Sequence, residues 1–178
     1  GSTKIFGRET FEKYFEILGR VGYIPGEIAL PAGLTGWEFL RMMQALQKCR
    51  NEERLAYLLK IFELDPSGET KRMSLGVKRK LAVVAAFMSD PEVLILDEPT
   101  SGLSPDLDME MMELLKDLTK KGRTVVIVTH AMENLDKCDK VAFLGRGGRL
   151  CYFGSSAGAL RWFNRRSYSR VFASLADE

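Results

Sequence analysis

The sequence predicts an α/β fold with a mainly parallel sheet, and three neighbouring stretches carry that prediction. Residues 93–96 form an uninterrupted aliphatic run, which is typical of a strand buried on both faces. Residues 124–128 form a second strand, rich in β-branched side chains. Between them, apolar side chains recur at helical spacing and predict an amphipathic helix that ends near Gly122: Leu107, Met111, Leu114, Leu115 and Leu118. A strand, a helix and a strand in this order favour parallel pairing.

The amino-terminal part predicts two short strands and two helices. We expect a strand at residues 4–6, a helix at 10–18, and a strand at 21–24 that runs into Pro25-Gly26-Glu27. Thr35 and Glu38 have the T-x-x-E spacing of a capping box. A helix is therefore expected to start there and to run to about Lys48.

Residues 51–90 predict two further helices. Asn51 can cap the first, whose apolar stripe is expected in the core, and the turn residues 64–68 end it. Ser74 is a favourable N-cap for the second. Three cations at residues 78–80 follow in its first turns, where they oppose the helix dipole. Either the start of this helix faces a phosphate or these charges are solvated, and both readings stay open at this point.

The last fifty residues predict a hairpin and short helices. Residues 131–136 suit a short helix, and strands at 141–144 and 149–153 flank a glycine-rich turn. Two short helices follow, with aromatic side chains that we expect to pack on the domain: Trp162, Phe163, Tyr168 and Phe172.

Composition excludes several classes of protein. The charges nearly cancel, with 26 basic and 24 acidic residues, so no global field favours a nucleic-acid partner. The three cysteines show no metal-binding spacing, which favours a reducing, cytosolic compartment. The longest apolar stretch, residues 81–88, is too short to span a bilayer.

Two adjacent carboxylates, Asp97 and Glu98, follow the aliphatic strand directly. At the carboxyl end of a strand they would lie on the rim of the sheet, where open α/β folds bind ligands. One carboxylate can hold Mg²⁺ while its neighbour polarises a water for attack on a phosphate. The alternative is a solvated acidic turn.

Residues 94–103, which read LILDEPTSGL, resemble the Walker B segment and following loop of ATP-binding cassette (ABC) ATPases. The resemblance implies that Asp97 supports Mg²⁺ and that Glu98 is the catalytic glutamate. His130, the only histidine, ends the stretch TVVIVTH and resembles the switch histidine that contacts the γ-phosphate.

Three further segments resemble motifs of the same family, with departures. Residues 23–26 resemble the Q-loop, with Gly26 where glutamine is expected and Glu27 as the nearby group that could replace it. Residues 73–77 resemble the signature LSGGQ, in which Ser74 and Gly76 match while leucine and valine replace the first glycine and the glutamine. The resemblance implies that this segment binds the γ-phosphate of ATP held by the opposite subunit.

The D-loop motif SGLDP is matched by residues 101–105, with Ser104 in the place of its aspartate. The resemblance covers residues 4–178 and implies a P-loop NTPase-like fold. We expect a partial ABC-type ATPase domain at 1–178, with a helical subdomain at about 33–90, a core with the Walker B segment and the switch histidine at 91–154, and a helical tail at 155–178.

No glycine is followed by lysine, so the sequence holds no G-x-x-x-x-G-K-[ST] phosphate loop. We therefore expect an amino-terminally truncated ATPase domain that is inactive alone. The resemblance implies an ATP-hydrolysing subunit of an ABC transporter, of exporter type, acting as a dimer with ATP and Mg²⁺ at the interface. The alternative is a non-hydrolysing regulatory or interaction module that retains the fold.

The partners that the resemblance implies are a second ATPase subunit, identical or different, and a transmembrane permease subunit. Through that permease the protein would lie on the cytoplasmic, inner face of the cell membrane.

Overall fold

The computed structural model describes residues 2–176, and the chain divides into two compact units at residues 128 and 129. The first unit contains β1 (Lys4–Ile5), β2 (Arg8–Glu9), α1 (Tyr14–Leu18), β3 (Val21–Ile24), α2 (Gly36–Gln47), α3 (Glu52–Ile61), η1 (Thr70–Arg72), α4 (Leu75–Phe87), β4 (Val93–Asp97), α5 (Pro105–Lys120) and β5 (Thr124–Val128). The second contains η2 (Leu135–Lys137), β6 (Val141–Leu144), η3 (Arg146–Gly148), β7 (Leu150–Gly154), α6 (Ser156–Trp162) and α7 (Tyr168–Ala176).

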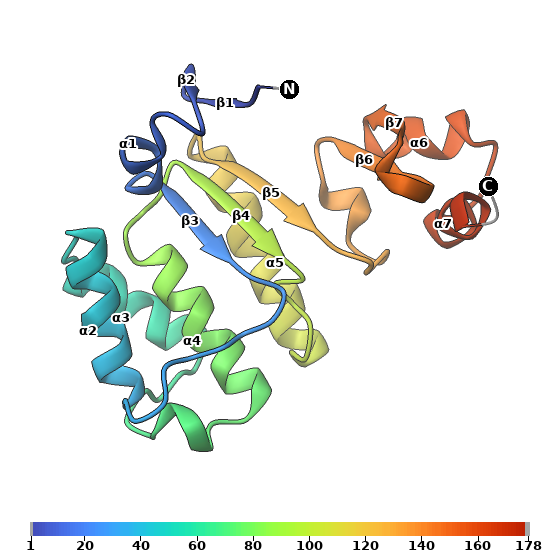
Figure 1. Cartoon of the computed structure of the whole chain (residues 1–178). Coiled ribbons are helices and arrows are strands. Elements are labelled where there is room, and N and C mark those ends of the chain that lie inside the picture. The colour runs from blue at the N-terminus through green and yellow to red at the C-terminus, as the bar shows by residue number, and fades with distance from the viewer. Residues whose placement is uncertain (1, 177–178) are drawn as a thin grey trace. The chain divides into compact units, whose positions relative to one another are not determined.

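The first unit is organised on a three-stranded parallel sheet in the order β3-β4-β5 (Figure 1). Val93 pairs with Val21 on one side and with Thr124 on the other, and Asp97 pairs with Val128. Because the three strands are parallel, their carboxyl ends share one edge of the sheet. The chain leaves β4 at the centre of that edge.

One face of the sheet carries the core. Leu94 and Leu96 of β4 are fully buried, and they pack in one cluster with side chains of α2, α3, α4 and α5. Ile24, Val125 and Ile127 extend this face onto β3 and β5. The expectation that β4 is buried on both faces is wrong, because its alternate residues are only half-buried. An aliphatic run does not separate a strand with one covered face from a strand with two.

The helices begin where their capping residues predict. Thr35 accepts from the backbone N–H of Glu38 while Glu38 accepts from that of Thr35, so the capping box at α2 is confirmed. Asn51 caps α3 by accepting from Arg54. Ser74 caps α4 by accepting from Val77 at 3.3 Å.

An ion pair joins the residues that directly precede β3 and β4. The guanidinium of Arg20, just before β3, donates to both carboxylate oxygens of Glu92, just before β4, at 2.5 and 2.7 Å. Hydrogen bonding by this guanidinium holds the pKa of Glu92 below its ordinary value. The same guanidinium lies 3.6 Å from the ring centre of Phe6, a cation–π contact.

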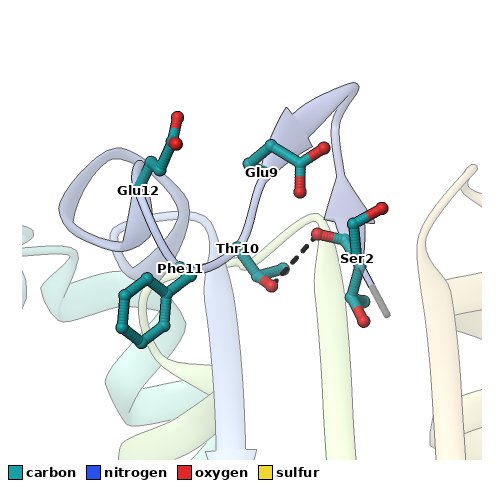
Figure 2. Close-up of a pocket in the computed structure, with 6 residues that line it drawn as sticks. Ser2, Glu9, Thr10, Phe11 and Glu12 are labelled. Atoms are coloured by element: carbon teal, nitrogen blue, oxygen red, sulfur yellow. Dashed lines mark hydrogen bonds between the residues drawn. The ribbon is translucent and has the colours of Figure 1, made fainter.

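An open hollow of about 460 Å³ lies in the amino-terminal segment that precedes β3 (Figure 2). Residues before β1, at the end of β2 and after β2 line it, among them Ser2, Glu9 and Phe11. Thr10 stabilises one wall, since its hydroxyl and its N–H both donate to the carbonyl of Thr3. The hollow therefore belongs to the end of the sheet where the strands begin, away from the acidic edge.

The second unit is an antiparallel hairpin, β6-β7, packed with α6 and α7. Val141, Phe143, Ala159, Val171 and Leu175 form its core. The expected packing of the aromatic side chains holds for Phe163 and Tyr168, which contact this core. Trp162 lies against Tyr152, with ring centres 6.2 Å apart, but it is 70% exposed, and Phe172 is 51% exposed. No helix among residues 2–176 combines the length and apolar character that crossing a membrane requires.

Candidate active site at the carboxyl edge of the sheet

The two acidic residues at the end of β4 differ in backbone conformation. Asp97 is the last residue of the strand and is half-buried. Glu98 has φ +48°, in the left-handed region that side chains other than glycine rarely adopt. Its N–H donates to the carbonyl of Val128 at 2.8 Å, and its carbonyl accepts from Ser101 at 3.2 Å. The backbone of Glu98 is thus held from both sides in a strained conformation at the edge of the sheet.

A tight turn leads from Glu98 to α5. Leu103 donates to the carbonyl of Thr100 at 3.0 Å, and Gly102 takes φ +78°. Ser104 is the N-cap residue of α5 and Pro105 is its first residue. The side chain of Ser104 makes no capping hydrogen bond in the described chain and is exposed. The cross-subunit contact expected of Ser104 stays a prediction.

Gly26 lies directly against the Asp97 carboxylate. A Cβ atom on Gly26 would be 2.8 Å from Oδ2 and 3.2 Å from Cγ of Asp97. A side chain at this position would therefore displace the carboxylate. This close approach is a physical reason for glycine where the resemblance leads one to expect glutamine. Glu27, the next residue, is exposed.

Arg79 binds the main chain of the same turn. Its side chain lies on α4 and the residue is only 3% exposed. Its two terminal nitrogens donate to the carbonyls of Pro25 at 3.1 Å and Gly26 at 2.8 Å. Sequence reasoning missed this role by grouping Arg79 with the flanking lysines. The signal was its position one turn before the buried Val83, on the face of α4 that enters the core.

The start of α4 contacts the turn after β4. A Cβ atom on Gly76 would be 3.2 Å from the carbonyl oxygen of Gly102, so these two backbones pack closely. Leu75 is 58% exposed, and its side chain approaches the Cβ position of Gly102 to 3.8 Å. Ser74 at the N-cap is exposed as well. Ser74 and Gly76 thus belong to the same neighbourhood as the turn that follows the acidic pair.

The first unit brings together most of the residues that the sequence singles out. Asp97, Glu98, Gly26 and the start of α4 all lie at or beside the carboxyl edge of the sheet, as the contacts above require. His130 belongs to the second unit, two residues after β5 ends, and is exposed. Its expected contact with a phosphate stays a prediction.

The chemistry of this edge suits a magnesium ion bound together with phosphates. Asp97 provides a half-buried carboxylate. Gly26 lies beside it, and because glycine has no Cβ atom, the carboxylate keeps its position. Among residues 2–176, no three histidine, cysteine or acidic side chains form a cage for a metal. Mg²⁺ is usually held by one or two carboxylates, with waters and substrate phosphates as its other ligands.

Comparison with protein-family models matches residues 33–136 to the family described as "AAA domain, putative AbiEii toxin, Type IV TA system". The matched segment runs from before α2 to beyond β5 and includes Asp97, Glu98 and His130.

Curated relatives of this chain include ATP-binding proteins. Over its whole length the chain is 28% identical to an ABC transporter ATP-binding/permease protein of Mycobacterium tuberculosis, of which it covers 22%. It is 34% identical to a linearmycin resistance ATP-binding protein of Bacillus subtilis, over 72% of this chain and 43% of that protein. The chain thus spans about a fifth to two fifths of the lengths of these relatives.

A solved structure described as the ATP-binding subunit of an ABC transporter superposes with a TM-score of 0.88 at 28% identity. The match covers 98% of this chain and 76% of that structure. The fold class expected from the sequence, a mainly parallel α/β sheet with helices, is thereby confirmed.

Proposed function

Because this chain belongs to the family of AAA-type ATPase domains, with ABC transporter ATP-binding proteins as its relatives, we propose that it supplies one catalytic face of an ATP site that drives an exporter. The ATP would lie between this chain and a second ATPase subunit, and a transmembrane permease would anchor both at the inner face of the membrane. We assign about residues 33–90 to the helical subdomain, 91–154 to the core with the Walker B segment and the switch histidine, and 155–178 to a helical tail, of which 177 and 178 lie outside the described residues.

The observation that carries this proposal is the acidic pair at the centre of the carboxyl edge. In this proposal Asp97 is the carboxylate that supports Mg²⁺, and Glu98 is the base that holds the attacking water. Mg²⁺, when bound, neutralises charge that develops on the phosphates. Because Glu98 leaves the strand in a left-handed conformation, its carboxylate need not follow the alternation of β4. The two acids can therefore perform separate tasks.

The start of α4 would act on the nucleotide held by the opposite subunit. Ser74 presents a hydroxyl at a helix N-terminus, where backbone N–H groups and the helix dipole favour an anion. Gly76 allows the backbone there to approach closely. Ser104 would contact the other subunit at the start of α5, and Glu27 would lie near the metal.

The test is ATP turnover by the native polypeptide that carries this sequence, assembled with its membrane partner. Glu98→Gln removes the basic carboxylate but keeps the size of the side chain, so ATP should still bind while turnover falls about 10²- to 10⁴-fold. Asp97→Asn should instead weaken binding of the magnesium–nucleotide complex.

Glu63→Gln is the matched control, because Glu63 is also a glutamate with positive φ, at +45°, but follows α3. Its turnover should equal that of the wild type. Near-normal turnover by Glu98→Gln would contradict the assignment of the base.

A second function, a non-hydrolysing module, is favoured by one observation. Leu75 stands exposed where the signature motif has a glycine, so a branched side chain occupies the surface that would meet the phosphate. The same assay separates the two functions. Wild-type protein that binds ATP without turnover, and in which Glu98→Gln changes nothing, would support the module.

A further inference from the structure

Arg79 is a buried cation whose acceptors are neutral. Its guanidinium donates to two main-chain carbonyls, and its Nε has no hydrogen-bond partner within the described chain. Burying an arginine in this way is costly, because the charge loses its hydration. A solvated arginine on the outer face of α4 would avoid that cost. The cost of burying Arg79 therefore points to a specific role for its hydrogen bonds to residues 25 and 26.

The turn connects Arg79 to the Asp97 carboxylate. Arg79 donates to the carbonyl of Gly26, and a Cβ atom on the same residue would be 2.8 Å from Oδ2 of that carboxylate. Gly26 has no side chain of its own with which to anchor the turn. The β3–β4 pairing fixes the chain up to Ile24, and beyond it Arg79 holds the main chain of the turn by two hydrogen bonds.

The other end of the connection is the start of α4. Arg79 lies five residues after Ser74, which is about 7.5 Å along one continuous helix. A displacement of the helix start is transmitted to Arg79 because an α-helix moves as a rigid element over this length. Gly76 also packs on the turn that follows the acidic pair.

We propose that Arg79 is a positioning residue, which holds the turn at Pro25 and Gly26 against Asp97 and so couples the start of α4 to the metal-binding carboxylate. This inference rests on the proposed function, in which Asp97 holds the metal and α4 contacts the nucleotide of the opposite subunit. Engagement of one nucleotide would then adjust the metal site of the other. If Arg79 had only a structural role, its substitution would change the stability of the fold and nothing else.

The test uses Arg79→Lys and Gly26→Ala in this chain, with Mn²⁺ alone as a paramagnetic probe. Lysine keeps the charge but cannot donate to two carbonyls in a fixed fork. Alanine pushes the turn away from Asp97 while Arg79 stays intact. Each variant should weaken Mn²⁺ binding by about tenfold, as changes in the groups that orient metal ligands generally do. The double variant should lose little more, since both changes act through one contact.

Backbone ¹⁵N order parameters give a readout that does not depend on the metal. Those of Gly26 and Glu27 should be about 0.85 in the wild type and clearly lower in Arg79→Lys. Arg54→Lys is the matched control, because Arg54 also donates to a main-chain carbonyl, that of Phe87 at 2.8 Å, but at the other end of α4. It should reduce stability without changing Mn²⁺ binding or the order of the turn.

Asp97→Asn separates the two possible failures. Equal Mn²⁺ binding by the wild type and Asp97→Asn would refute the metal role of Asp97 in the proposed function, and with it the coupling. If Asp97→Asn abolishes binding but Arg79→Lys leaves both affinity and order parameters unchanged, the proposed function stands and the role of Arg79 is overturned. Should Arg79→Lys not fold, Gly26→Ala decides by the same affinity criterion.

Discussion

The left-handed backbone at Glu98 predicts an unusual ranking of substitutions. A non-glycine residue with φ near +48° experiences steric repulsion of about 1–2 kcal/mol, which glycine avoids. Glycine in turn loses more conformational freedom on folding, about 0.5–1 kcal/mol relative to alanine. The midpoints of the two ranges differ by about 0.75 kcal/mol in favour of glycine. Glu98→Gly should therefore be more stable than Glu98→Ala.

Comparing these two variants with each other cancels the effect of losing the glutamate side chain, because both lack it. Free energies of unfolding from denaturant titration of this chain provide the measurement. Met109 supplies the control, as an exposed residue inside α5 where ordinary helix propensity applies. There the ranking should be reversed, with alanine more stable than glycine by about 1 kcal/mol. Equal rankings at the two positions would show that Glu98 is not strained.

Two further predictions concern the ends of the sheet. Leu75→Gly should tighten ATP-dependent association with a subunit that carries an intact phosphate loop, on the order of tenfold, because it removes the side chain that would meet the phosphate. Leu46→Gly, at an exposed leucine of α2, is the control. If Leu75→Gly changes neither association nor stability, Ser74 is a helix cap only. At the opposite end of the sheet, hydrogen bonds from Arg20 lower the pKa of Glu92 in the folded chain below its ordinary value of 4.5. The Arg20–Glu92 pair therefore stabilises the fold above pH 4.5, and this contribution is lost as the pH falls and the folded carboxylate becomes protonated. Glu92→Gln should flatten the decline of the unfolding free energy over this acidic range relative to Glu63→Gln, and an unchanged decline would contradict the role of the pair.

The sequence correctly predicted those elements whose ends depend only on neighbouring residues. The caps at Thr35, Asn51 and Ser74 needed only neighbouring residues, and β3 was predicted with its observed bounds. Longer-range hydrogen bonds account for one miss. The helix expected at 10–18 begins only at Tyr14, because Thr10 is bonded to Thr3 in the β1–β2 hairpin.

A local side-chain contact accounts for a second miss. Residues 131–136 were expected to be helical, but the chain forms only the short η2 at Leu135–Lys137. The hydroxyl of Thr129 accepts from the N–H of Ala131 at 3.0 Å. Such side-chain bonds compete with helix formation, and a spacing rule for apolar residues does not register them.

At the site, the sequence identified residue types better than contacts. The acidic pair and the start of α4 were found from their order along the chain, and the structure places them at or beside one edge. The contact of Gly26 with Asp97 joins segments 71 residues apart, and no local rule predicts such a pair. The burial of Arg79 was missed for the same reason, since its acceptors lie on the turn after β3.

The two departures from expectation at this edge have one explanation. Only glycine permits the turn after β3 to lie on the Asp97 carboxylate, because any Cβ atom there would overlap with it. A glycine gives up the side chain through which a residue such as glutamine could reach the metal or anchor its own loop. The anchor must then act on the main chain, and a planar donor with two parallel N–H groups suits two successive carbonyls. In the proposal above Arg79 is that anchor, and a substitution that places glutamine at position 26 would have to displace the carboxylate.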